Sequence, residues 1–151
     1  MSSYIVSPGG AGGLATSPPV LTLTTGVAGD LVIASLQDVT ISNANDIFTW
    51  TQLNNAGKNQ IATTSTNSIS TNLVVDGDTY FGATGTAGSA VALGIQGLST
   101  AKTRVTWSIN IGDKVLTGAG YVTGLSPTVS ADSPVWVTPV TITVDGEITT
   151  A

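Results

Sequence analysis

The sequence contains no histidine and no cysteine, and its only glutamate is Glu147. Lys and Arg together number 4, and Asp and Glu together number 9, among 151 residues. Near neutral pH, most acid–base and nucleophilic catalysis uses His, Cys, Glu or Lys, or a metal that such side chains bind. The composition therefore predicts that the chain is not an enzyme and holds no cofactor or metal ion.

Basic side chains are also scarce, which bears on the partners of the chain. The formal net charge is -5, and Lys58, Lys102, Arg104 and Lys114 are the only cations among the side chains. Direct nucleic-acid binding needs clustered Lys and Arg, so we do not expect it. No continuous apolar run reaches the length of about 20 residues that a membrane helix needs. The N-terminus shows no secretory signal, which predicts synthesis in the host cytoplasm.

Short stretches that alternate between apolar and polar residues dominate the sequence. They occur at 20–25, 31–41, 47–53, 69–75, 91–95, 104–111 and 136–144, and the Asn-rich residues 43–46 are expected to form a turn between two of them. Strong helix formers are rare, Thr and Val are abundant, and no window shows helical periodicity. The pattern predicts an all-β domain over residues 19–151, an antiparallel β-sandwich or jelly roll.

Three dipeptides predict tight turns between these strands. Asp76-Gly77, Gly112-Asp113 and Asp145-Gly146 each lie between alternating stretches. Asp-Gly and Gly-X suit the primed turns of β-hairpins, because such turns need positive φ. The paired acids around Gly77 and Gly146 also suggest calcium ligands, but the further oxygen ligands of a calcium loop are missing. A hairpin turn is therefore the better interpretation at both places.

The N-terminal residues have a different composition. Gly and Pro dominate residues 7–19, which predicts an extended arm over residues 1–18 rather than a folded element. Such an arm is either a flexible tail or a segment that lies on its own domain or on a neighbouring subunit. In the second case its larger side chains are the candidate partner-binding residues, namely Tyr4, Ile5, Val6, Leu14 and Pro18.

Aromatic residues are few, and each lies in a strand-like context. Trp107 and Trp136 are in phase with apolar neighbours, so both are expected in the core. Trp50 shares a strand face with Phe48, and its position is open between the core and the surface. If exposed, Trp50 and Tyr80 are candidates for stacking against a glycan.

The expected solvent face of the strands carries Thr, Ser and Asn in place of charged residues. Ordinary soluble domains protect their sheet edges and their solubility with charge. An uncharged face loses little solvation energy when another subunit covers it. The pattern is therefore typical of a subunit that is packed into an assembly, although a secreted surface protein can also be rich in Thr and Ser.

In overall composition the chain resembles the capsid decoration, or cement, proteins of tailed bacteriophages. The shared features are the Gly/Pro arm, the Thr-, Ser-, Gly- and Val-rich β domain, the acidic balance and the lack of Cys. The resemblance implies a virion protein that binds the major capsid protein on the outside of the shell, as a homotrimer. The alternatives are a tail, baseplate or fibre protein that binds a glycan or receptor, and a cell-surface adhesion module.

Overall fold

The computed structural model describes residues 20–33, 36–111 and 114–151. The predicted N-terminal arm, with Tyr4, Ile5, Val6, Leu14 and Pro18, lies outside the described residues. Its role as a separate segment beside one domain therefore stays a prediction.

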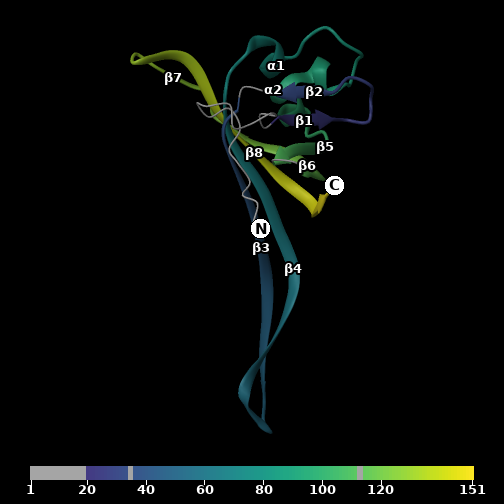
Figure 1. Ribbon diagram of the computed structural model, residues 1–151, viewed down its shortest axis with the longest axis vertical. Helices are drawn as coiled ribbons and strands as arrows, with labels where there is room; N and C mark the ends of the chain where they lie inside the picture. Colours follow the sequence, from purple (N-terminus) through teal and green to yellow (C-terminus); the bar gives the residue numbers. More distant parts are fainter. Residues whose placement is uncertain (1–19, 34–35, 112–113) are drawn as a thin grey trace, which may run out of the picture.

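Most of the described chain forms antiparallel β structure, as predicted (Figure 1). The elements in chain order are β1 (Leu21–Thr24), β2 (Leu31–Ile33), β3 (Leu36–Gln52), β4 (Asn55–Val74), α1 (Gly77–Phe81), α2 (Ala90–Ala101), β5 (Val105–Ile111), β6 (Lys114–Leu125), β7 (Thr128–Ser130) and β8 (Ser133–Thr150). The strands belong to one eight-stranded sheet in the order β2-β1-β5-β6-β8-β4-β3, with β7 beside β8. The all-β prediction is confirmed. This single hydrogen-bonded sheet does not confirm the finer choice of a sandwich or a jelly roll.

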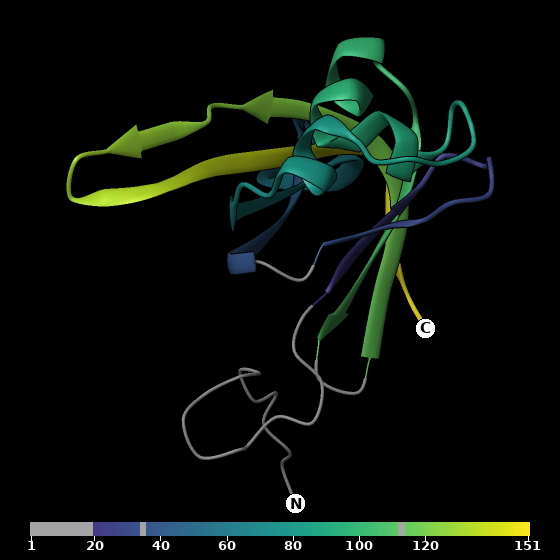
Figure 2. The same cartoon turned by 90° about the horizontal axis from the view of Figure 1, so that it is seen from above.

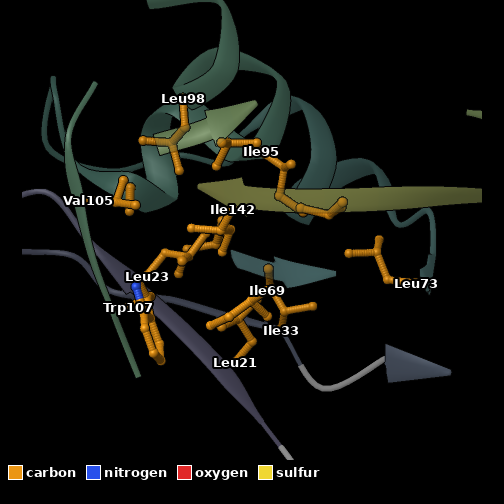
Figure 3. Close-up of a cluster of buried hydrophobic side chains, with 14 of the residues drawn as sticks. Leu21, Leu23, Ile33, Ile69, Leu73, Ile95, Leu98, Val105, Trp107 and Ile142 are labelled. Atoms are coloured by element: carbon orange, nitrogen blue, oxygen red, sulfur yellow. The ribbon is translucent and has the colours of Figure 1, made fainter. Parts of the chain in front are cut away.

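The hydrophobic core lies between one face of this sheet and α2. Every second residue of β5 points into it, with Trp107 fully buried, and Ile142 of β8 is buried on the same face. Ile95 and Leu98 of α2 close the core from above the sheet (Figure 3). Burying apolar surface on one face is what two-residue alternation dictates for a strand. The expected core position of Trp107 is confirmed.

The opposite face of the sheet carries hydroxyl groups, as the alternation predicts. Figure 2 shows both helices on one side of the sheet, and no described helix covers the other side. On that side the Thr123 and Thr143 hydroxyls lie 3.0 Å apart on neighbouring strands, and Thr123 also donates to the carbonyl of Thr141. Cross-strand hydroxyl pairs of this kind stabilise a sheet without charge. The face is mostly polar and uncharged, as predicted, but it also carries the exposed ion pair of Arg104 and Asp145 (2.9 Å).

The two helices contradict the expectation of an entirely strand-like chain. Residues 91–95 alternate in sequence, yet they lie in α2, where Ala90, Ile95 and Leu98 are buried. Ser89 starts the helix because its hydroxyl accepts a hydrogen bond from the amide of Ala92. Tertiary packing overrides the low helix propensity of this stretch, because the core face of the sheet needs a cover.

Two of the three predicted hairpin turns are also wrong. Asp76 and Gly77 begin α1, and Asp145 and Gly146 lie inside β8. Gly146 has φ 97° at a register shift between β6 and β8, so its positive φ serves a bulge. Gly112 and Asp113, the third predicted turn, lie outside the described residues, while the flanking strands β5 and β6 pair antiparallel with Ile111 opposite Lys114.

Gly94 interrupts α2 where the two helices approach most closely. Its φ is 67°, and a Cβ atom there would lie 2.4 Å from the amide nitrogen of Gly82 and 2.7 Å from the carbonyl oxygen of Tyr80. We expect Gly94→Ala to lower the free energy of unfolding by about 2–3 kcal/mol, from backbone strain and overpacking. Gly77→Ala is the matched control, because a Cβ at Gly77 meets no atom within 4 Å. Urea denaturation of both variants checks this, and equal stability would contradict the packing argument.

Candidate assembly surfaces

The longest feature of the molecule is a two-stranded ribbon that leaves the body of the sheet. β4 pairs with β8 only from Ser68 to Val74, whereas its pairing with β3 continues to Gln52 and Asn55. Residues 43–67 therefore form a free β-hairpin, here called the β3–β4 arm (Figure 1). At about 3.3 Å per residue, the arm extends about 33 Å from the body.

The arm includes the residues for which the sequence predicts a turn. Residues 43–46 continue β3, and the chain reverses only at Leu53 and Asn54. Near Asp46 the register shifts by one residue, which marks a β-bulge. Two hydroxyl groups donate hydrogen bonds to Asp46 at this bulge. The Thr63 hydroxyl donates to the Asp46 carbonyl oxygen (3.1 Å), and the Thr64 hydroxyl donates to the Asp46 carboxylate (2.9 Å). Side-chain hydrogen bonds thus replace the core that the arm lacks.

Apolar side chains lie exposed on the arm. The rings of Phe48 and Trp50 stack with centroids 5.9 Å apart, and Ile61 is the cross-strand partner of Phe48. Trp50 is 36% exposed, so the structure places it outside the core. Opposite residues of an antiparallel pair share a face, which puts these three side chains together. We call them the arm patch.

A free arm of this kind is a poor structure for an isolated subunit. A two-stranded hairpin is marginally stable in water without a further strand or a covering surface. Besides the arm patch, Ile47 and the turn residue Leu53 are exposed. Exposed apolar groups on an unprotected edge strand favour association with another chain. The arm is thus the strongest candidate for a binding surface.

A second, shorter hairpin projects from the body in another direction. β7 and the start of β8 form it, and Figure 1 shows it on the side of the body away from β1 and β2. Val129, Val135 and Trp136 are exposed there. Trp136 is 50% exposed, so its predicted core position is wrong. The alternation that includes Trp136 continues along β8 to the buried Val140, but β4 pairs with β8 only as far as Val137, so Trp136 lies at the base of the projecting hairpin and its side chain is half exposed.

The aromatic pair predicted to face a glycan does not come together. Tyr80 lies in α1, is only 5% exposed and packs edge-on against Phe81. Trp50 lies in the arm, at the other end of the long axis (Figure 1). The expectation for Tyr80 is wrong because the Asp76-Gly77 signal starts a helix that turns this side chain inward. Phe48 and Ile61 take the place of Tyr80 beside Trp50; their alternation with Trp50 was visible in the sequence, but their exposure was not.

The end of the body opposite the arm has its own character. The β1–β2 turn is held against the start of α2, because Thr25 donates to the Gly88 carbonyl oxygen (2.8 Å) and Val91 donates its amide to Gly29 (3.3 Å). This turn and α1 each expose an apolar and an acidic side chain. We call this region the α1-end surface, formed by Val27, Asp30, Asp76, Asp78 and Phe81.

The described residues offer little for chemistry. Among them, no three His, Cys, Asp or Glu side chains gather into a group that could hold a metal ion. None of the helices in the described ranges has the length and hydropathy to cross a bilayer.

No known family model matches the chain, and no curated protein matches its sequence. Solved structures do match its fold. A chain in the tail of an empty gene transfer agent particle, refined with helical C6 symmetry, is 14% identical, with a TM-score of 0.63 over 87% of this chain and 95% of that one. A chain in the six-fold symmetrised baseplate of the anti-feeding prophage is 10% identical, with a TM-score of 0.66 over 100% of this chain and 97% of that one. A chain in the extended sheath-tube complex of an extracellular contractile injection system, PVC, is 13% identical, with a TM-score of 0.53 over 88% and 87%.

These matches show that the chain shares its fold with chains found in tail, baseplate and sheath-tube particles. Each match covers at least 87% of this chain and of the other chain, so the shared fold spans most of the domain. They support neither a capsid decoration protein nor a homotrimer, which the compositional resemblance implied. The alternative location, in a tail or baseplate, agrees better with them.

Proposed function

We propose that this protein is a non-enzymatic structural subunit of the tail or baseplate of a phage-like particle, where it binds further copies of itself. The β3–β4 arm is the observation that carries the proposal. It extends beyond its own core, exposes stacked aromatic rings and has no second covering surface within the described residues. The fold that it shares with chains of tail and baseplate particles supports the same conclusion.

The assembly mechanism follows from burial and copy number. When the arm patch is covered by another subunit, each fully buried aromatic side chain contributes about 1.5–3 kcal/mol. Edge strands can also form backbone hydrogen bonds with a neighbouring subunit. The neighbouring faces carry little charge, so little electrostatic repulsion opposes this pairing. Each subunit then gives one arm and receives another, so weak contacts repeat along the particle and reinforce each other. This chemistry needs no catalytic group, in keeping with the composition.

A double substitution in the arm patch tests the proposal. We expect Phe48→Ser with Trp50→Ser to remove about 3 kcal/mol of burial per contact and to raise the critical concentration for assembly about 100-fold. The thermal stability of the subunit should change little, because both side chains lie outside the core. Sedimentation velocity and electron microscopy of the purified protein measure assembly.

Tyr121→Ser is the matched control for this test. Tyr121 is an aromatic residue with an exposure of 38%, close to that of Trp50, but it lies on the outer face of β6. We expect this variant to assemble like the wild type. An equal loss in both variants would argue against a special role of the arm. A wild-type protein that stays monomeric at all accessible concentrations, and is missing from purified particles by mass spectrometry, would contradict the proposed function.

A further inference from the structure

We propose that the tip of the β3–β4 arm of one copy docks on the α1-end surface of the next copy, so that subunits stack head to tail. This inference rests on the proposed function and adds to it the receiving surface and the direction of stacking. The occupant of the α1-end surface is thus a second copy of this chain, and its contacting segment is the arm turn with the arm patch.

The placement of the two surfaces favours this contact. Figure 1 shows the arm tip at one end of the longest axis, and α1 with the β1–β2 turn at the other end. A donor and an acceptor at opposite ends of one molecule make a heterologous contact, which repeats along an axis without closing on itself. An arm that reaches about 33 Å beyond the body can cross to a neighbour without a clash between the two bodies.

The charges of the two surfaces are complementary. Lys58 lies in the β4 strand of the arm, opposite Thr51 and therefore on the face of the ribbon away from the arm patch, and it is the only basic residue of the arm. The α1-end surface has three exposed carboxylates, from Asp30, Asp76 and Asp78, and no basic residue. Opposite charges at the edge of an apolar contact steer association and set its register.

The apolar groups of the two surfaces also correspond. Phe81 is exposed at the end of α1, and Val27 is exposed in the β1–β2 turn, which lies against the start of α2. The arm brings Leu53 at its turn and the stacked rings of Phe48 and Trp50. An apolar centre with charges at its rim is the usual anatomy of a protein interface.

Other described surfaces fit the arm tip less well. The outer sheet face presents hydroxyls that are already bonded to each other and to backbone carbonyls, as at Thr123 and Thr143. The tip of the β7–β8 hairpin has apolar residues but only one acid, Asp132, to meet Lys58. The α1-end surface combines both kinds of complementarity.

Cross-linking gives the direct test, because the chain has no cysteine to interfere. A Leu53→Cys variant is mixed with a Phe81→Cys variant, the mixture is assembled, and a short bismaleimide is added. Each molecule then carries one thiol, so a covalent heterodimer reports contact between copies. The matched control replaces the second partner with Val129→Cys, on the β7–β8 hairpin. We expect the Leu53–Phe81 mixture to give most of the heterodimer and the control mixture to give little.

The outcomes separate this inference from the proposed function. Assembly with heterodimer only in the Val129 mixture, or in neither mixture, overturns the docking at α1 while the structural role stands. Failure of the wild-type chain to assemble contradicts the proposed function itself. Heterodimer in the Leu53–Phe81 mixture without assembly would mean a chance encounter, and it would overturn the docking as well.

Charge reversal tests the same contact without a cross-linker. We expect Lys58→Glu and Asp78→Lys each to raise the critical concentration about fivefold at low salt, and an equimolar mixture or the double variant to restore it. Salt should reduce all these differences, because ions screen exposed charges. Lys114→Glu is the matched control, since Lys114 begins β6 and lies outside both surfaces. Additive defects in the double variant would contradict a direct pairing of the two residues.

Discussion

Replacing residues 44–66 with Asn-Gly should produce a folded subunit that no longer assembles at any accessible concentration. Asn43 and Asn67 pair across the base of the arm, and a two-residue Asn-Gly turn can join them there. The deletion removes the arm patch and the turn residue Leu53 together, so the whole contact surface of the arm is lost. Electron microscopy and sedimentation velocity would show monomers where the wild type forms particles.

The body should keep its structure in this deletion because the base of the arm is retained. Asn67 is buried and donates to the Gly146 carbonyl oxygen (3.1 Å), and β4 keeps its whole pairing with β8. A thermal unfolding midpoint within a few degrees of wild type would confirm that the loss is specific to assembly. Normal assembly of the deletion variant would show that the arm is dispensable and would contradict the proposal.

Replacing Trp107 with Ala should have the largest effect of any single substitution on stability. Trp107 is 0% exposed, and its ring packs so closely on β6 that a Cβ at Gly118 would lie 2.8 Å from it. Truncation of a buried Trp costs about 3–5 kcal/mol. The indole nitrogen has no hydrogen-bond partner among the described residues, so the loss is one of packing alone. Urea denaturation gives the difference in the free energy of unfolding.

Trp136→Ala is the matched control, because both tryptophans lie on β-strands in alternating sequence. Trp136 is 50% exposed on the projecting β7–β8 hairpin, so we expect a loss below about 1 kcal/mol. The comparison separates burial from residue type. Similar losses in the two variants would mean that the β7–β8 hairpin is packed in solution, contrary to the structure.

The sequence alone predicted most of the sheet. The alternation in β5 and along β8 places Val105, Trp107, Ile109 and Ile142 on one face, and the structure confirms it. Two-residue periodicity is a local property of an extended backbone, so it can be detected without tertiary contacts. The antiparallel pairing of β5 with β6 follows for the same reason, since strands that are adjacent in sequence need only a short connection.

The helices and the turn signals needed information from elsewhere in the fold. Ala90–Ala101 is helical because its apolar residues cover the core face. Only glycine fits at position 94, because a side chain there would collide with the end of α1. Asp145-Gly146 has the composition of a hairpin turn, but β6 pairs with β8 at Asp145 and again at Thr149, which keeps the strand continuous across Gly146. Such pairing is decided by residues distant in sequence, which outweigh a local preference.

The binding surfaces divide in the same way. The scarcity of charge and of reactive side chains was visible in the sequence, and it directed the interpretation toward assembly and away from catalysis. Periodicity placed Trp136 in the core like Trp107 and left Trp50 open, yet only Trp107 is covered.

The sequence by itself determined most of the strands, the hydroxyl-rich face and the scarcity of reactive side chains, because each follows from the identity and spacing of neighbouring residues. Only the tertiary structure decided where the sheet stops. β8 ends its pairing with β4 at Ser68, and beyond that point the same alternating pattern has no second layer to bury it. A strand that continues past its sheet becomes an arm, and its apolar residues become a surface for another subunit.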